Sequence, residues 1–405
     1  MSKIITEHPE MRTLSLPGTS PVAYCGIAVK AGTRNEGTDE HGLAHLCEHL
    51  SFKGTARRTA TQIINAIEGL GGELNAFTNK EDTVYYCAIQ RQHVRRALDV
   101  LQDIVFCSTY PQHEVEKERE VVCEEIESYE DTPSELIYDE FENILFDGHP
   151  LGHNILGTAE RVRSFSGDDA KSFTSRWYKP ENCVMFVSGV QEFRSLGVTD
   201  NRPAMEKVLS ATPELLNSCN SSTSSTVVIE KGTHQAHVML GTVGYAAADS
   251  RRWALYLLNN ILGGPAMNSR LNMSLRERRG LVYTVESTMA CYSDTGLWSV
   301  YFGCDAADVD RCCRLVRREL DAMMEKPLSD ARLRAAKRQL QGQLAIANEN
   351  REQVVIDSAR NFLHTGRVRS ISDVMKHIDA LTADDLLLTA QQLFVPERIT
   401  TLVYK

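Results

Sequence analysis

The stretch His41-Gly-Leu-Ala-His-Leu-Cys-Glu-His-Leu50 carries two histidines four residues apart, with a glutamate just before the second. In a helix, His45 and His49 project from one face, and Glu48 lies on the same side, three residues after His45. Leucine, alanine and cysteine supply an apolar side, and acidic residues precede the segment, as is common at helix starts. The pattern predicts an amphipathic helix with two imidazoles and one carboxylate on its polar face.

These three side chains suit a metal site. Two neutral imidazoles supply nitrogen ligands for zinc, and a neighbouring carboxylate can accept a proton from water. The order His-x-x-Glu-His is the inverted form of the zinc protease motif. A polar helix face with two histidines by chance is the alternative, but a chance match is expected only roughly 0.03 times in such a chain. We therefore expect His45 and His49 to bind zinc and Glu48 to act as a general base.

A zinc ion that activates water needs a third protein ligand. The segment from His113 to Tyr129 contains seven glutamates and is predicted to be helical, with most of them on a solvated charged face. Glu118 and Glu125 lie seven residues apart and therefore on one side of such a helix, two turns from each other. The spacing alone does not decide which carboxylate would bind the metal.

The composition limits the class of protein. The chain has 405 residues, of which 42% are hydrophobic, so its length predicts two to three domains with sizeable cores. The net charge of -10 disfavours generic nucleic-acid binding and favours cationic partners. There is no apolar run near 18 residues and no export signal, and the eleven cysteines have no regular spacing. These features predict a cytoplasmic protein with reduced thiols and no membrane partner.

The chain reads as two halves with a similar order of predicted elements, separated by a polar run. We expect a zinc-binding domain at 1–197, a linker at 198–224 and a similar second domain at 225–405. The first helix of the second half carries Trp253 and leucines where the first half carries its histidines, so the second domain lacks the metal site. Each domain should be of the α+β class, a mostly antiparallel sheet with helices packed on one side.

The metal motif, followed 76 residues later by Glu125, resembles the pitrilysin or insulysin-type zinc peptidases. The similarity is greatest to the short branch that contains the mitochondrial processing peptidase and its bacterial relatives. It extends over Gly72-Glu-Leu-Asn-Ala-Phe-Thr78, His149-Pro-Leu-Gly-His-Asn-Ile-Leu-Gly157 and Leu275-Arg-Glu-Arg-Arg-Gly-Leu-Val-Tyr283, and so covers both halves. The resemblance implies that Glu125 is the third zinc ligand and that Glu118 orients a ligating histidine from behind.

The resemblance also implies residues that contact substrate. Taken alone, Arg276 and Tyr283 read as a basic helix end and an ordinary strand tyrosine. In the family, an arginine and a tyrosine at this spacing approach the substrate near the zinc, where they can stabilise an oxyanion. In long single-chain members that pair comes from a further domain, so this chain is expected to pair with a second copy or with a related subunit. The strand of Asn75, Ala76 and Phe77 resembles the edge where extended substrates add as a strand, although Phe77 fits a core position equally well.

The expected function is therefore that of a zinc metalloendopeptidase that hydrolyses unfolded or extended peptides inside a chamber. The acidic composition favours basic peptides as substrates. The alternative is a non-catalytic scaffold or recognition subunit of a related peptidase complex, whose signature would be the loss of a motif residue. A zinc-binding peptide carrier is a third possibility, and it would not need Glu48.

Overall fold

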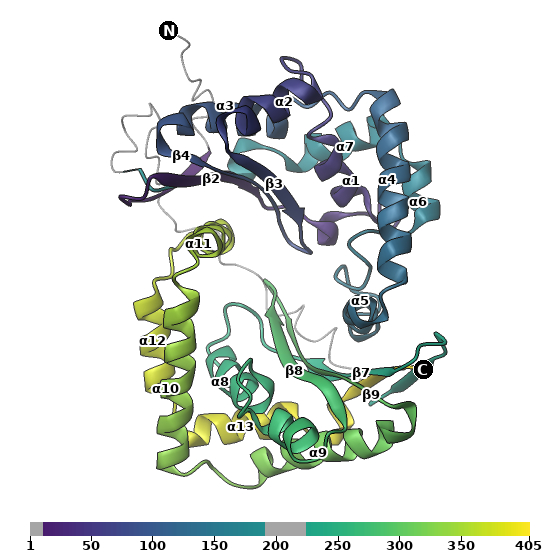
Figure 1. Cartoon of the computed structure of the whole chain (residues 1–405), viewed down its shortest axis with the longest axis vertical. Coiled ribbons are helices and arrows are strands. Elements are labelled where there is room, and N and C mark those ends of the chain that lie inside the picture. The colour runs from purple at the N-terminus through teal and green to yellow at the C-terminus, as the bar shows by residue number, and fades with distance from the viewer. Residues whose placement is uncertain (1–10, 191–223) are drawn as a thin grey trace. The chain divides into compact units, whose positions relative to one another are not determined.

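A computed structural model describes residues 11–190 and 224–405. The predicted linker 198–224 therefore lies, apart from its last residue, outside the described residues. The described chain forms two compact units, each built on a five-stranded sheet (Figure 1). Unit 1 comprises 11–128, 153–190 and 348–369, and unit 2 comprises 129–152, 224–347 and 370–405.

The two sheets share one topology. The strands of unit 1 are β1 (Arg12–Leu16), β2 (Val22–Val29), β3 (Glu73–Thr78), β4 (Thr83–Gln90) and β5 (Cys183–Ser188), in the spatial order β1-β5-β2-β4-β3. Those of unit 2 are β6 (Thr226–Ile229), β7 (Ala236–Val243), β8 (Val282–Cys291), β9 (Gly296–Cys304) and β10 (Thr400–Tyr404), in the order β6-β10-β7-β9-β8. In each sheet only the first pair, β1 with β5 and β6 with β10, is parallel. The identical order indicates a duplicated unit, and the predicted α+β class is confirmed.

The helices of unit 1 are α1 (Leu43–Leu50), α2 (Ala60–Ile67), α3 (Val94–Phe106), α4 (Gln112–Glu130), α6 (Ala159–Ser164), α7 (Gly167–Trp177) and α11 (Arg351–Thr365). Those of unit 2 are α5 (Pro133–Leu145), α8 (Arg252–Gly263), α9 (Val309–Glu325), α10 (Asp330–Ala347), α12 (Ile371–Ala380) and α13 (Ala383–Leu393). A π-helical turn, η7, spans Asn272–Glu277. Several helices begin at a serine or threonine that forms a capping box. In α2, the Thr59 hydroxyl accepts the Gln62 N–H, and the Gln62 side chain accepts the Thr59 N–H.

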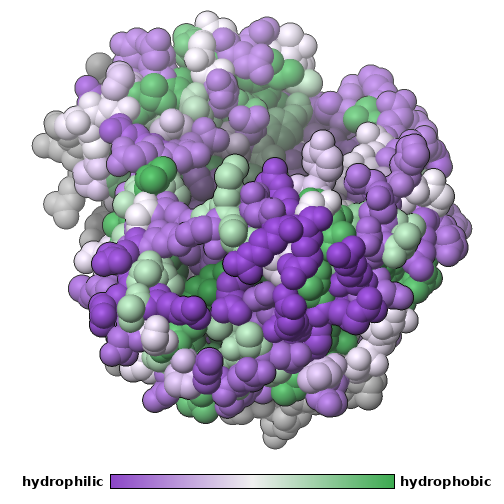
Figure 2. All heavy atoms as spheres, turned by 60° about the horizontal axis from the view of Figure 1, so that its bottom comes forward, coloured by the Kyte–Doolittle hydropathy of each residue, from purple (hydrophilic) through white to green (hydrophobic). Residues whose placement is uncertain are grey.

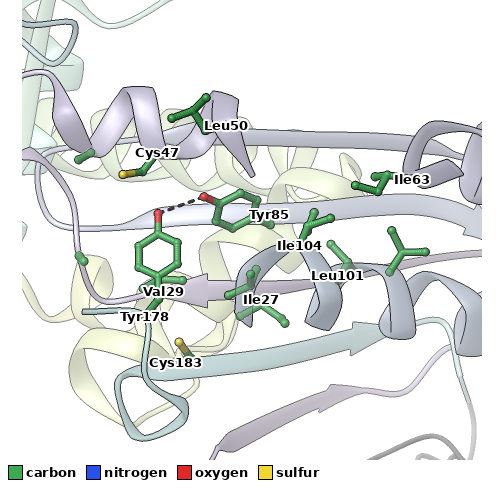
Figure 3. Close-up of a cluster of buried hydrophobic side chains, with 14 of the residues drawn as sticks. Ile27, Val29, Cys47, Leu50, Ile63, Tyr85, Leu101, Ile104, Tyr178 and Cys183 are labelled. Atoms are coloured by element: carbon green, nitrogen blue, oxygen red, sulfur yellow. Dashed lines mark hydrogen bonds between the residues drawn. The ribbon is translucent and has the colours of Figure 1, made fainter. Parts of the chain in front are cut away.

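The main core of unit 1 lies between its sheet and the helices α1, α3 and α7 (Figure 3). Ile27, Leu50 and Leu101 are fully or almost fully buried there. The Tyr85 and Tyr178 hydroxyls are 3.0 Å apart and hydrogen-bonded, so that two buried phenols satisfy each other. This core fixes the apolar side of α1 and leaves the opposite side of the helix for the motif histidines.

One helix in each unit comes from the other half of the chain. Adjacent strand residues such as Ile27 and Ala28 point to opposite faces, yet both are fully buried, so both faces of the first sheet are covered. The second face packs against α11 through Val355, Ala359 and Leu363. Figure 1 shows this by colour, since the yellow-green α11 lies with the purple and blue strands of unit 1.

The exchange is reciprocal. Helix α5, from the first half, packs on the sheet of unit 2 through Ile137, Phe141 and Leu145, against Met239 and Leu402 among others. We call α5 and α11 the exchanged helices. They add to the helix layer that the sequence predicts on one side of each sheet, and they are the reason why the compact units differ from the two sequential halves.

A buried ion-pair cluster anchors α11 to unit 1. The Asp82 carboxylate is 1% exposed and accepts hydrogen bonds from Arg360 Nε at 2.9 Å and from His364 Nε2 at 2.8 Å. Burial acts to raise the pKa of Asp82, but the bond from His364 and the Arg360 charge outweigh it and lower the pKa to about 2. The stabilisation is therefore present above the unfolded-state pKa of about 3.9 and is lost as the pH falls toward 2.

Asp82→Asn is accordingly expected to reduce the free energy of unfolding by about 2–3 kcal/mol at pH 7, since a pKa lowered from about 3.9 to about 2 corresponds to that amount. Urea denaturation at pH 7 and near pH 2 measures the difference from wild type, which should shrink at the lower pH. Asp168→Asn, at a side chain that is 91% exposed, is the control. A difference that stays constant between the two pH values would contradict this account of the Asp82 cluster.

No helix among the described residues has both the length and the apolar character needed to cross a membrane. The face in Figure 2 is covered mainly by hydrophilic side chains, with hydrophobic ones in small scattered groups.

Candidate metal centre

The motif residues lie on α1, with their ring and carboxylate groups directed away from the core. Leu43, Leu46 and Leu50 of α1 are buried in the core of unit 1. His45 and Glu48, on the other side of the helix, are 7% and 8% exposed. The predicted amphipathic helix is therefore present over the whole motif, and its polar side is itself largely shielded from solvent.

Glu125 of α4 completes a cluster of three ligand atoms. Its Oε2 atom lies 3.8 Å from His45 Nε2 and 3.6 Å from His49 Nε2, and the ligand atoms of the three residues all lie within 4.8 Å of one another. The two imidazole rings are edge-on to each other, with centroids 4.6 Å apart. In the part of the chain that the structure describes, this is the one group of three such residues that could hold a metal ion.

The geometry fits zinc. Two ligand atoms that are each about 2.1 Å from a tetrahedral ion lie about 3.4 Å apart. The observed separations of 3.6 and 3.8 Å are close to this value and too long for hydrogen bonds. Burial, with a smaller effect of the His49 charge, lowers the pKa of His45 to about 3, so His45 keeps a free lone pair at neutral pH. The donor set and its protonation thus match a zinc site.

Glu118, about two turns before Glu125 on α4, supports His49. Its Oε2 atom lies 3.3 Å from His49 Nδ1, and its Oε1 atom lies 2.7 Å from Lys53 Nζ. Burial acts to lower the pKa of His49, but the bond to Glu118 and the nearby carboxylates raise it above the usual value. The bond to Nδ1 orients the ring so that Nε2 points toward Glu125, as expected of a carboxylate behind a metal-binding histidine.

Glu48 is held by a residue that the motif analysis did not single out. The Thr78 hydroxyl, at the end of β3, donates to Glu48 Oε2 at 2.6 Å, and both residues are buried. Burial raises the pKa of Glu48 and this bond opposes the rise. The sequence could have indicated this contact, because residues two apart in a strand point to the same face. Leu74, Ala76 and Thr78 therefore share the face of β3 that packs on the helices.

The predicted substrate strand lies at the edge of the first sheet. β3 pairs with β4 on one side, and no other strand of the described residues pairs with it on the other. Asn75 is exposed, whereas Ala76 and Phe77 are half-buried. Phe77 packs in the cluster beneath α11 and meets the Tyr86 ring edge-on at 6.1 Å, so its side chain is a core contact.

Arg276 and Tyr283 lie in unit 2. Arg276 belongs to η7 and lines a cavity of about 530 Å³ together with residues of α8, β8 and α10. Tyr283, at the start of the edge strand β8, is 83% exposed. The structure thus brings together His45, His49 and Glu125 with Glu48 and Glu118, while the role of Arg276 and Tyr283 stays a prediction.

Comparison with known proteins identifies the family. Residues 13–159 match the model of the insulinase family, peptidase family M16, and residues 164–340 match the model of the peptidase M16 inactive domain. The protein named uncharacterized zinc protease YmxG of Bacillus subtilis is 30% identical over 99% of this chain and 95% of its own length. The uncharacterized zinc protease SCO5738 of Streptomyces coelicolor is 34% identical over 94% of this chain and 84% of its own.

Solved structures share the fold. A crystal structure of a protease from Helicobacter pylori has a TM-score of 0.87 at 22% identity and covers 98% of this chain and 97% of its own. A peptidase M16 inactive domain from Pseudomonas fluorescens has a TM-score of 0.84 at 20% identity and covers 98% of this chain. At these identities the two structures support the fold, whereas the family follows from the sequence matches. The chain belongs to the insulinase family of peptidases, family M16, and its relatives YmxG and SCO5738 are both named uncharacterized zinc proteases.

Proposed function

We propose that the protein is a zinc metalloendopeptidase that hydrolyses extended peptides, with His45, His49 and Glu125 as the zinc ligands. The observation that carries this proposal is the convergence of these three ligand atoms within 4.8 Å beside a buried glutamate on the same helix. A non-catalytic subunit would not need Glu48, whereas here Glu48 is held in place by Thr78.

The residues of the site divide the chemistry among them. Zinc, when bound, supplies a Lewis acid that polarises the scissile carbonyl and makes a water molecule more acidic. Glu48 accepts the proton of the attacking water and returns it to the leaving amine, as general base and then general acid. The Thr78 hydroxyl fixes one Glu48 oxygen, and Glu118 fixes the His49 ring, so that both groups keep their orientation during the reaction.

The second half of the chain, residues 225–405, is proposed to contribute to substrate binding. Arg276 and Tyr283 are candidates for stabilising the oxyanion, since a guanidinium or a phenol can donate to it. The 83% exposure of Tyr283 leaves its hydroxyl free to reach a bound molecule. We propose that these residues act on the metal centre of a second subunit, either another copy of this chain or a related one.

The edge of β3 is the proposed binding site for substrate backbone. An extended peptide can add to this edge through main-chain hydrogen bonds, which give affinity with little sequence preference. Asn75 is exposed there and available for a side-chain contact. Ala76 and Phe77 would contribute through their backbone, because Phe77 is packed against the core under α11. Folded proteins would be poor substrates, since their strands are already paired.

Removal of the metal tests this proposal directly. Protein that has been stripped with a chelator and dialysed is expected to lose peptide cleavage, and one equivalent of zinc should restore it, because two imidazoles and a carboxylate are a ligand set of catalytic zinc sites. Mass spectrometry of a mixture of unstructured peptides detects the fragments. Wild-type protein that binds zinc and cuts none of the peptides, alone or with a related subunit, would instead favour a scaffold or carrier role.

Basic peptides are expected to be cleaved faster than acidic ones. The chain has a net charge of -10, and α4 exposes Glu124 beside Glu125. Electrostatic steering of this kind accelerates association by about 10-fold or more and weakens with salt. The measurement is kcat/KM for peptides of equal length that differ only in Lys/Arg or Asp/Glu content, at low and high salt. Equal rates for the two series would contradict the expected preference.

A further inference from the structure

Helix α1 starts without a capping side chain of its own. Its N-cap residue is Gly42, whose φ of 94° is in the left-handed region and which offers no side-chain acceptor. A Cβ atom at this position would lie 2.6 Å from the Leu156 carbonyl oxygen. A serine or aspartate cap is therefore sterically excluded, and the first amides of the metal-binding helix need another partner.

Glu36 supplies that partner from six residues upstream. Its Oε2 atom accepts the Gly42 N–H at 3.1 Å and its Oε1 atom accepts the Ala44 N–H at 2.7 Å. The Glu36 side chain is fully buried. A carboxylate at this end of a helix also interacts favourably with the helix dipole. The acidic residue that the sequence places ahead of the motif is thus a buried cap.

His153 fixes the carboxylate of Glu36. His153 Nε2 lies 3.0 Å from Glu36 Oε2 and 3.1 Å from the Thr33 carbonyl oxygen. Both neighbours are acceptors, so Nε2 carries a proton and donates. The His153 ring stacks on His41 with centroids 3.9 Å apart, and the buried Lys80 ammonium donates to the His153 carbonyl oxygen.

Burial acts on both titratable groups of this cluster, and the hydrogen bonds show which forms fit its geometry. Burial, then the Lys80 charge, lower the pKa of His153 to about 4, so it donates to Glu36 as a neutral ring at neutral pH. Burial, with a smaller effect of the nearby Glu40, raises the pKa of Glu36 well above its usual value, and the two backbone bonds and Lys80 only reduce this rise. Three donors converge on its two oxygens, which is the arrangement that suits an acceptor-only carboxylate.

This cap matters for His45 because, among the described residues, no hydrogen bond orients the buried His45 ring. His49 is oriented by Glu118, whereas His45 Nδ1 is buried and has no hydrogen-bond partner among the described residues. The direction of His45 Nε2 toward Glu125 then depends on the packing of the ring against His49 and on the backbone at the start of α1. Ala44, whose amide Glu36 holds, is the residue immediately before His45.

We propose that Glu36 and His153 are positioning residues of the metal centre, which hold the first turn of α1 and thereby aim His45 at the metal. The inference rests on the proposed zinc site, but not on peptide cleavage. It assigns His153, in the loop that follows α5, a role in metal affinity although no atom of this residue is a ligand.

Three variants test the proposal, with zinc affinity measured by competition against a chromogenic chelator. Glu36→Gln replaces one acceptor oxygen by an NH2 group that meets an N–H donor, so zinc affinity is expected to fall about 10- to 100-fold. His153→Leu removes the donor to Glu36 and should lower zinc affinity in the same direction. His153→Gln retains an N–H donor and should restore part of the loss. Glu40→Gln, at a carboxylate in the same segment that bonds Gly37 and Arg176, should stay within about twofold of wild type.

The spectrum of bound cobalt and the steady-state kinetics separate positioning from general support. We expect the cobalt-loaded Glu36→Gln variant to have a changed absorption spectrum. We expect the zinc-saturated variant to have a lower kcat with an unchanged KM. Thermal melting of the metal-free proteins shows whether each variant folds. If Glu36→Gln does not fold, the zinc affinity of His153→Leu tests the proposal. Folded Glu36 and His153 variants with wild-type zinc affinity and cobalt spectrum would overturn the proposal. Wild-type protein that binds zinc but cuts no peptide would overturn only the proposed peptidase activity. The zinc affinities of the variants would still test the positioning role of Glu36 and His153.

Discussion

Glu48→Gln is expected to reduce peptide hydrolysis about 10²- to 10⁴-fold while zinc remains bound. Gln keeps the size of the side chain and still accepts the Thr78 hydroxyl, but it cannot accept a proton from water. Because Glu48 is not one of the three residues whose ligand atoms converge, the metal content should stay at one equivalent. This variant therefore separates the loss of the base from the loss of the ion.

The measurement is fragment formation from a mixture of unstructured peptides, followed by mass spectrometry, with the zinc content of each preparation determined in parallel. Glu68→Gln, at an exposed position in the same unit, is the matched control and should cleave at the wild-type rate. A Glu48→Gln protein that is loaded with zinc and cleaves within about tenfold of wild type would place the general base elsewhere.

Phe141→Ala is expected to lower the free energy of unfolding by about 3–5 kcal/mol, which is the usual cost of emptying a well-packed phenylalanine site. Phe141 is 1% exposed and lies on the exchanged helix α5, where it packs against the sheet of unit 2. Most contacts of this helix are made with residues far away in the sequence, so the cavity cannot be filled by local rearrangement of the helix alone.

Urea denaturation measures this effect, with Leu388→Ala as the control because Leu388 is 63% exposed in the same unit. The control should change the free energy of unfolding by less than about 0.5 kcal/mol. A Phe141→Ala variant as stable as the control would mean that α5 contributes little to unit 2 and that the exchange is incidental to stability.

Local patterns in the sequence were sufficient for the parts of the fold that depend on local chemistry. The spacing of His45, Glu48 and His49 predicted the helix α1, and the order of the predicted elements in each half predicted an α+β protein. The choice of Glu125 as third ligand could not follow from spacing, because several glutamates of α4 recur at helical intervals. Family resemblance made that choice, and the structure places the Glu125 carboxylate beside both imidazoles.

Features that depend on tertiary contacts were not predictable in the same way. An apolar stripe shows that α5 and α11 bury one side, but it does not say which sheet covers it, and each packs on the sheet of the other half. Glu36 caps a helix that begins several residues later, so no capping spacing marks it. Thr78 meets Glu48 across 30 positions of sequence, through the pairing of a strand end with a helix.

The exchanged helices also set the order in which the chain can complete its folding during synthesis. The sheet of unit 1 needs α11, so its second face, which includes Leu14, Val84 and Phe186, stays without its cover until the ribosome has made residues 348–369. At about 5–20 residues per second, the interval after residue 190 lasts roughly 10–30 s. A nascent chain of this protein therefore exposes an apolar sheet face for that time, so chaperones that cover such a face during translation should raise its yield.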